Sequence, residues 1–246
     1  MMPQPLSQRI NRILSASGIT SRRKADEMIK AGRVSVNGSI VKEAGAQALW
    51  GVDRILVDGR VVPDPAERVY LMLNKPFGYV SALSDPAGRP VVAELLQDLG
   101  RRVYPVGRLD FDSLGLLLFT DDGEWAFRLA HPRFRVPKTY KVTVAGPVSD
   151  EALEKLKKGV HLEDGFSGPS KITLLRKNAK ASDLRITITA GRKRLLRRMI
   201  EASGYTVTHL IRIGFGSVEL GNLKVGRYRR LEPAEVEDMK KMVGLS

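Results

Sequence analysis

The hydrophobic residues at the start of the chain follow helical spacing. Apolar side chains within residues 10–14 fall on one helical face, and Ser7 stands where an N-cap is expected. Thr20 or Ser21 can cap a second helix that ends near Gly32. The pattern therefore predicts two short helices at the N-terminus.

Short strands replace helical spacing after the second helix. Asn37-Gly38 and Asp58-Gly59 each separate two runs of β-branched and aliphatic residues, and both dipeptides favour type I′ hairpin turns. Pro63-Asp64-Pro65 follows the second hairpin and has the composition of a linker. Residues 7–66 are therefore predicted to form a small first domain.

The remaining residues, 67–246, mix strands and helices without a regular βαβ order. Leu116–Phe119 has the length and composition of a buried strand, and Asp121-Asp122-Gly123 ends it with turn residues. Other strands are predicted at Val69–Leu73, Lys138–Val144, Leu184–Thr189 and Ile211–Leu220, and helices at Val91–Leu99, Glu124–Ala130, Asp150–Lys158, Arg194–Ser203 and Pro233–Val243. This order favours an α+β fold over a doubly wound sheet.

Charge adds a candidate partner. The 246 residues contain 41 Lys and Arg against 27 Asp and Glu, a formal net charge of +14. A cationic excess of this size attracts polyanions through phosphate neutralisation and counterion release. The composition therefore supports a nucleic-acid partner, although a generic basic surface would have the same composition.

The residue inventory excludes several kinds of chemistry. The chain has no cysteine, so disulfides and thiolate catalysis are excluded. Its three histidines lack metal-ligand spacing, and no glycine-rich nucleotide loop follows a strand, so neither a metal nor a cofactor is expected. No apolar run approaches the roughly 20 residues of a membrane span. We therefore expect a cytoplasmic protein without a membrane partner.

The run Val106–Gly123 contains the strongest candidate for chemistry. Its carboxylate, Asp110, lies between a glycine-bearing turn and the apolar strand, which is a common way to present a reactive group on a rigid sheet. Arg108 can hold Asp110 ionised or fix its direction through a charge-assisted hydrogen bond. In an arbitrary Gly-x-x-Asp sequence, an aspartate that merely caps a turn would be more common.

Over more than a dozen contiguous positions, this run resembles the catalytic motif of the RNA pseudouridine synthases, in the RsuA/RluB branch that modifies ribosomal RNA. The resemblance implies an isomerase that breaks the uridine C1′–N1 bond, rotates the base and rejoins it through C5, with Asp110 as the catalytic residue. It also implies an α+β catalytic domain at residues 67–246, in which a mixed, mainly antiparallel sheet is flanked by helices.

Two further positions match motifs of the same family. Tyr140, in Lys138-Thr139-Tyr140, matches a tyrosine that stacks on the target base, and Arg212 matches the basic residue that pairs with the catalytic aspartate. Each has a structural alternative, since Tyr140 could be an ordinary strand tyrosine and Arg212 a surface arginine. Asp112 invites comparison with two-carboxylate hydrolases, but a turn or polar partner is its favoured role because no further ligands have suitable spacing.

The N-terminal residues resemble a second known module. Ser21–Ala25 and Gly32–Gly38 are similar to the alpha-L RNA-binding domain, which precedes the catalytic domain in many rRNA pseudouridine synthases. Met199 and Ile200 mark the apolar side of the later basic helix, so its arginines are expected to be exposed. Contacts with RNA are predicted at Arg22, Arg23, Lys24, Arg33, Arg108, Arg192, Arg194, Arg197 and Arg198.

These motifs predict a bacterial rRNA pseudouridine synthase that acts as a monomer on ribosomal RNA or on a ribosome assembly intermediate. Ser84–Pro90 favours large-subunit (23S) rRNA, whereas Tyr70–Tyr79 and Gly226–Leu231 also suit a small-subunit (16S) enzyme. A catalytically silent RNA-binding assembly factor is an alternative, and so is a metal-dependent RNA hydrolase, which excess chelator would inhibit. The chain departs from the family pattern at Ser113, which keeps a hydroxyl and changes little, and at Leu114 and Leu195, which leave the fine specificity open.

Overall fold

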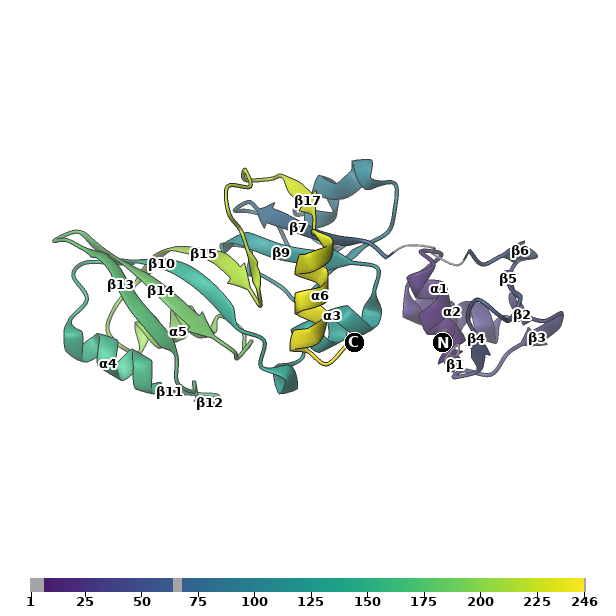
Figure 1. Ribbon diagram of the computed structural model, residues 1–246, viewed down its shortest axis with the longest axis horizontal. Coiled ribbons are helices and arrows are strands. Elements are labelled where there is room, and N and C mark those ends of the chain that lie inside the picture. The colour runs from purple at the N-terminus through teal and green to yellow at the C-terminus, as the bar shows by residue number, and fades with distance from the viewer. Residues whose placement is uncertain (1–6, 64–67, 246) are drawn as a thin grey trace. The chain divides into compact units, whose positions relative to one another are not determined.

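The computed structural model describes residues 7–63 and 68–245, which fall into two compact units (Figure 1). The first unit comprises the chain up to Val69 together with 100–103 and 121–123, and the second comprises the rest. The predicted boundary between residues 66 and 67, and most of the Pro63-Asp64-Pro65 linker, lie outside the described residues. Within the described ranges, no helix is long and apolar enough to cross a membrane.

The first unit combines two helices with a four-stranded sheet in the order β3-β2-β5-β6. Its elements are α1 (Ile10–Ala16), α2 (Arg22–Lys30), β2 (Val34–Val36), β3 (Ser39–Val41), β5 (Ile55–Val57) and β6 (Arg60–Val61). Apolar side chains of both helices and of strands β2 and β5 form one core, which includes Ile13, Leu14 and Ile29. The helical spacing of apolar residues that is seen in the sequence therefore places these side chains in the core.

Both predicted hairpin turns are confirmed. Asn37 and Gly38 have φ values of 50° and 86°, and Asp58 and Gly59 have values of 50° and 77°. Positive φ at both central residues is the requirement of a type I′ turn, which explains why Asn-Gly and Asp-Gly occupy these positions.

One predicted cap is confirmed and one is wrong. Ser21 caps α2, because its side-chain oxygen accepts a hydrogen bond from the Lys24 N–H. Ser7 does not cap α1; it belongs to strand β1 (Ser7–Arg9), which pairs with β4 (Gln47–Leu49). The Ser7 hydroxyl donates to Gln47 Oε1 at 3.0 Å, so strand pairing competes successfully with capping.

The second unit is built on a mixed sheet in the order β13-β14-β10-β15-β9-β7-β17 (Figure 1). These strands are β7 (Tyr70–Lys75), β9 (Leu114–Thr120), β10 (Lys138–Ala145), β13 (Lys171–Lys177), β14 (Ala181–Ile188), β15 (Val207–Phe215) and β17 (Tyr228–Arg230), and the short β8 (Tyr104–Pro105) and β16 (Val218–Glu219) pair with β9 and β15. The β9–β15 pair is parallel, whereas the other strand pairs described in this sheet are antiparallel. The expected α+β fold with a mainly antiparallel sheet is therefore confirmed.

Helices lie against both ends of this sheet. They are α3 (Gly123–Ala130), α4 (Asp150–Lys158), α5 (Leu195–Glu201) and α6 (Pro233–Met242), with 3₁₀ turns at η1 (Val92–Leu99) and η2 (Pro132–Phe134). Trp125 of α3 and Met239 of α6 are fully buried and share a core with Met72 of β7 and Leu118 of β9. A small hairpin, β11 (His161–Leu162) with β12 (Gly165–Phe166), follows α4.

Gly115 is the point of closest approach between β9 and β15. It has a φ of +99° and pairs with Arg212 in the parallel ladder. A Cβ atom at this position would lie 2.3 Å from the Arg212 carbonyl oxygen, far inside van der Waals contact. Only glycine therefore lets the strand that follows Asp110 lie beside the strand that carries Arg212.

We expect Gly115→Ala to lower the free energy of unfolding by about 3 kcal/mol, because positive-φ strain and the clash with β15 act together. Gly146→Ala is the matched control: its φ is +78°, but a Cβ there would meet nothing within 4 Å. That control should cost only about 1 kcal/mol of backbone strain. Urea denaturation measures the free energy of unfolding of both variants. Equal decreases would show that the close approach of Gly115 to Arg212 does not require glycine.

Candidate active site

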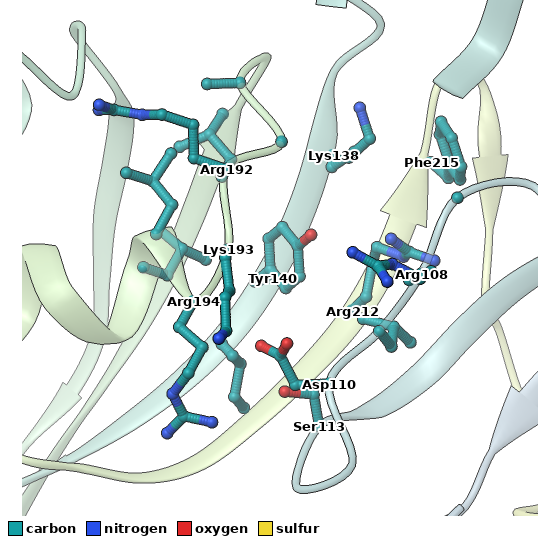
Figure 2. Close-up of a pocket in the computed structure, with 18 of the residues that line it drawn as sticks. Arg108, Asp110, Ser113, Lys138, Tyr140, Arg192, Lys193, Arg194, Arg212 and Phe215 are labelled. Carbon is teal, nitrogen blue, oxygen red and sulfur yellow. The ribbon is translucent and has the colours of Figure 1, made fainter. Parts of the chain in front are cut away.

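A cavity of about 250 Å³ opens between the Asp110 loop, β10, β15 and the segment before α5 (Figure 2). Six of the predicted functional residues line it: Asp110, Tyr140, Arg212, Arg108, Arg192 and Arg194. Among the described residues that line this cavity, Asp110 is the one carboxylate, while Lys138 and Lys193 add to the cationic side chains. The cavity therefore combines a single acidic group with a strongly basic wall.

Backbone contacts fix the position of Asp110. The Ser81 hydroxyl donates to the Leu109 carbonyl at 2.7 Å and accepts from the Leu109 N–H at 3.1 Å. The Ser113 N–H donates to the Asp110 carbonyl at 3.1 Å and closes the turn. In Figure 2 the Asp110 carboxylate points from this loop toward Tyr140. The loop is thus anchored through its backbone, and the carboxylate is presented to the cavity.

Three buried cations bind carbonyl groups around the same loop. Lys75 Nζ donates to the Ser113 carbonyl at 2.8 Å, Arg197 Nη2 to the Asp112 carbonyl at 3.0 Å, and Arg212 Nε to the Leu116 carbonyl at 2.7 Å. They come from β7, α5 and β15 and are 0%, 7% and 2% exposed. The loop that carries Asp110 is therefore held by charged donors from β7 and α5, and the strand that follows it is held by a third from β15.

Tyr140 and Arg212 lie opposite one another on paired strands, β10 and β15. A bulge between Thr139 and Tyr140 shifts the register at this point, and both side chains are largely buried. Arg212 Nη2 is buried without a hydrogen-bond partner, and no ion pair joins Arg212 to Asp110 within the described ranges. Arg212 and Asp110, which the resemblance predicts to pair, thus line the same cavity, and a direct contact between them stays a prediction.

Lys138 is a pocket residue that the sequence analysis missed. Its Nζ donates to the Val136 carbonyl at 3.2 Å and lies 5.0 Å from the centre of the Phe215 ring. Burial, with a smaller contribution from the Arg212 charge, lowers the pKa of Lys138 to about 8. Its place two residues before Tyr140 in the same motif was the signal that could have identified it.

Burial also lowers the pKa of Lys75 to about 8, while the charges of Asp112 and Asp110 oppose the shift. At neutral pH both Lys75 and Lys138 therefore still carry a proton. Lys138 adds its positive charge to that of Arg212 in the cavity lining, where the two charges favour anionic groups.

The arginines around α5 are paired with two carboxylates. Asp112 accepts hydrogen bonds from Arg194 at 3.0 Å and forms an ion pair with Arg197 at 3.2 Å. Asp164, beside the β11–β12 hairpin, forms ion pairs with Arg192 at 3.1 Å and Arg198 at 2.8 Å. Asp112 is thus a polar partner, as its spacing favoured.

The expectation that all the α5 arginines are exposed is wrong for Arg197, which is 7% exposed. Its guanidinium reaches inward to the Asp112 carbonyl, so the long aliphatic part of the side chain is covered. Whether Arg192, Arg194, Arg197 and Arg198 contact RNA stays a prediction.

The candidates of the first unit lie at the start of α2 and directly before β2. Arg22, Arg23 and Lys24 are exposed in the first turn of α2. Arg33 is also exposed and donates to both carboxylate oxygens of Asp58. In the part of the chain that the structure describes, no three His, Cys, Asp or Glu side chains gather to hold a metal ion.

Two family models match the chain. Residues 69–202 match the model described as RNA pseudouridylate synthase, and residues 8–48 match the S4 domain model. The first match contains Asp110, Tyr140 and Arg197, and the second contains the basic start of α2.

Similar proteins match over nearly the full length. An RNA pseudouridine synthase of Aquifex aeolicus is 44% identical over 96% of this chain and 95% of its own length. Ribosomal large subunit pseudouridine synthase B of Bacillus subtilis is 42% identical over 95% of this chain and 96% of its own. A crystal structure of a pseudouridylate synthase superposes with a TM-score of 0.68 at 32% identity, covering 94% of this chain and 99% of the other.

Proposed function

Because the chain belongs to the RNA pseudouridylate synthase family and has an S4 domain, we propose that it isomerises a uridine of large-subunit ribosomal RNA at Asp110. The observation that carries this proposal is the cavity in which Asp110 is the one carboxylate among the described lining residues. Similarity to the large-subunit synthase of Bacillus subtilis supports the choice of RNA. We propose that the substrate is ribosomal RNA, either free or within an assembly intermediate.

The reaction conserves every atom of the uridine. The C1′–N1 bond breaks, the base rotates and a C1′–C5 bond forms, while C5 loses a proton and N1 gains one. A carboxylate beside the ribose can act as a nucleophile or as a base in these steps. Asp110 is suited to that role because its backbone is fixed and its carboxylate faces the cavity.

Tyr140 and Arg212 are proposed to act on the same nucleotide. The Tyr140 ring lies in the cavity, where it can stack on a uracil ring that has left its helix. The unpartnered Nη2 of Arg212 is a charged donor that substrate binding can bring into contact with the Asp110 carboxylate. The uridine must be flipped out of its stack to reach either residue.

Mapping of pseudouridines in ribosomal RNA tests this proposal. Total rRNA from cells with and without the protein would be compared, and the missing site would then be restored on an unmodified transcript with the purified full chain. We expect one large-subunit uridine to depend on the protein. Loss of a small-subunit site would move the substrate to the other RNA, and an unchanged map would refute the proposal.

We also propose that the enzyme works in the cytoplasm as a monomer.

The first unit should contribute RNA affinity through its basic residues. Changing Arg22, Arg23 and Lys24 together to glutamine should weaken RNA binding and reduce the log–log salt slope by about 2 to 3, since each lost phosphate contact accounts for about 0.7–0.9. Removal of residues 1–64 should reduce the slope at least as much. The reaction rate at saturating RNA should change less than the affinity.

A triple change on α4 is the matched control. Glutamine at Lys155, Lys157 and Lys158 removes the same charge from the last turn of α4. Filter binding over a range of salt concentrations compares the variants. Equal slopes in both triple variants would mean that net charge, and not contact by α2, sets the affinity.

A further inference from the structure

Two exposed phenylalanines meet beside the Asp110 loop. Phe77 is 62% exposed and Phe111 is 41% exposed, and their ring centres lie 6.1 Å apart. Phe111 follows Asp110 directly in the sequence, so their Cα atoms are about 3.8 Å apart. The aromatic pair therefore adjoins the one carboxylate of the described cavity lining.

The two loops that carry these rings are fixed to each other. The Gly78 N–H donates to the Phe111 carbonyl at 3.0 Å, and Lys75 Nζ donates to the Ser113 carbonyl at 2.8 Å. Gly78 has a φ of +80°, and a Cβ atom there would already touch the Phe111 ring at 4.0 Å. That distance is ordinary van der Waals contact, so the positive φ is what favours glycine here. The two hydrogen bonds fix the loops to each other, and little ordering is needed before a ligand binds.

The charges around the pair suit a polyanion. Asp112 follows Phe111, and its negative charge is offset by Arg194 and Arg197. Arg108, Lys193 and Arg194 line the adjoining cavity. A phosphate backbone can therefore pass close to the rings without meeting an unpaired carboxylate at residue 112.

The size of the pair indicates the kind of ligand. Two side chains are far too small for a stable protein interface, which buries on the order of 1,000 Å² or more. A planar nucleobase matches a phenylalanine ring in size, and every base has a face that can stack on it. Unpaired RNA bases are commonly held in this way.

We propose that Phe77 and Phe111 form a stacking platform for a nucleobase that neighbours the target uridine. This inference rests on the proposed function, and it concerns the RNA next to the reacting nucleotide. The target uridine enters the cavity with Asp110 and Tyr140, and because Phe111 follows Asp110 in the chain, a base adjacent to the uridine is within reach of the platform. The platform thereby holds the RNA strand while the uridine is flipped.

The test uses the full chain with Phe77→Leu and Phe111→Leu combined, acting on unmodified large-subunit rRNA transcript. Leucine keeps an apolar side chain and removes the flat ring. We expect KM to rise about fivefold or more, in line with the loss of one base–aromatic stack, while the rate at saturating RNA stays within about twofold. The single variant Phe111→Tyr keeps both flat rings, so its KM should stay close to that of the wild-type chain.

Phe127→Leu is the matched control, because Phe127 on α3 is 45% exposed and its ring lies against His131, which directly follows the helix. Its KM should equal that of the original chain. A second test uses two RNAs, each of which lacks the base on one side of the mapped uridine. The wild-type chain should bind one of them more weakly than the intact RNA. The double variant should bind that RNA as well as it binds the intact RNA.

Each result decides the question. An unchanged KM in a folded double variant, or losses that simply add between the variant and the abasic RNA, would overturn the platform while leaving the proposed function intact. If the original chain forms no pseudouridine in any ribosomal RNA, the proposed function fails and the inference fails with it.

Discussion

Asp110→Asn should abolish pseudouridine formation, with a loss of about 10⁴-fold or more in the single-turnover rate. The asparagine amide has nearly the same shape as the carboxylate but is neither a nucleophile nor a base for this reaction. The Asp110 backbone is held by the Ser113 N–H and by the contacts of Leu109 with Ser81, so the fold should be unaffected. RNA affinity should remain within a few-fold of the original, on the order of a lost surface charge.

Asp112→Asn is the control for this experiment, since Asp112 lies two residues away and is ion-paired with Arg194 and Arg197. It should weaken the attachment of the loop to α5 and lower the rate far less than the change at Asp110. Release of tritium from uridine labelled at C5 measures both rates. Substantial turnover by Asp110→Asn, free of original enzyme, would remove Asp110 from the catalytic role.

Arg212→Met should lower the single-turnover rate by roughly 10²–10³-fold and change RNA affinity much less, because a buried charged donor is lost from the reaction site. Arg212 is 2% exposed, and its Nη2 is a buried donor without a hydrogen-bond partner among the described residues. The Leu116 carbonyl would also lose its donor, at a cost of about 1–3 kcal/mol in the free energy of unfolding.

Arg212→Lys separates catalysis from stability. The lysine keeps a positive charge but not the fork of two nitrogen donors, so it should recover part of the rate and part of the stability. Thermal melting identifies variants that remain folded, and single-turnover assays at saturating RNA then report on the site. If folded Arg212→Met reacts at the original rate once saturated, Arg212 contacts a phosphate and not the reacting groups.

The family resemblance seen in the sequence was sufficient to predict that Asp110, Tyr140 and Arg212 share a site, although it did not identify Lys138. The apolar strand after Asp110 and the motifs around Tyr140 and Arg212 are local patterns, and the cavity lining contains all three. The turns at Asn37-Gly38 and Asp58-Gly59 were equally predictable, because each turn depends on the φ values of its own two residues.

Features that depend on distant partners were not predictable in the same way. Lys75 and Arg197 bind carbonyl groups, which every residue has, so no sequence signal marks their partners. Strand β13 was missed because Ile172 is its one fully covered apolar residue within Lys171–Lys177 and no alternation results. The sequence predicts a cap at Ser7 because the pairing of β1 with β4 has no local signature.

The parallel ladder between β9 and β15 also determines when the reaction site can exist during synthesis of the chain. Arg212 is added about 100 residues after Gly115, which takes roughly 5–20 s at ordinary rates of translation. Strand β17, which pairs with β7 at the edge of the sheet, is made later still. By contrast, the strand pairs of the first unit form between residues 7 and 61. We therefore expect the first unit to fold early during synthesis. The site around Asp110 can form only after β15 has left the ribosome.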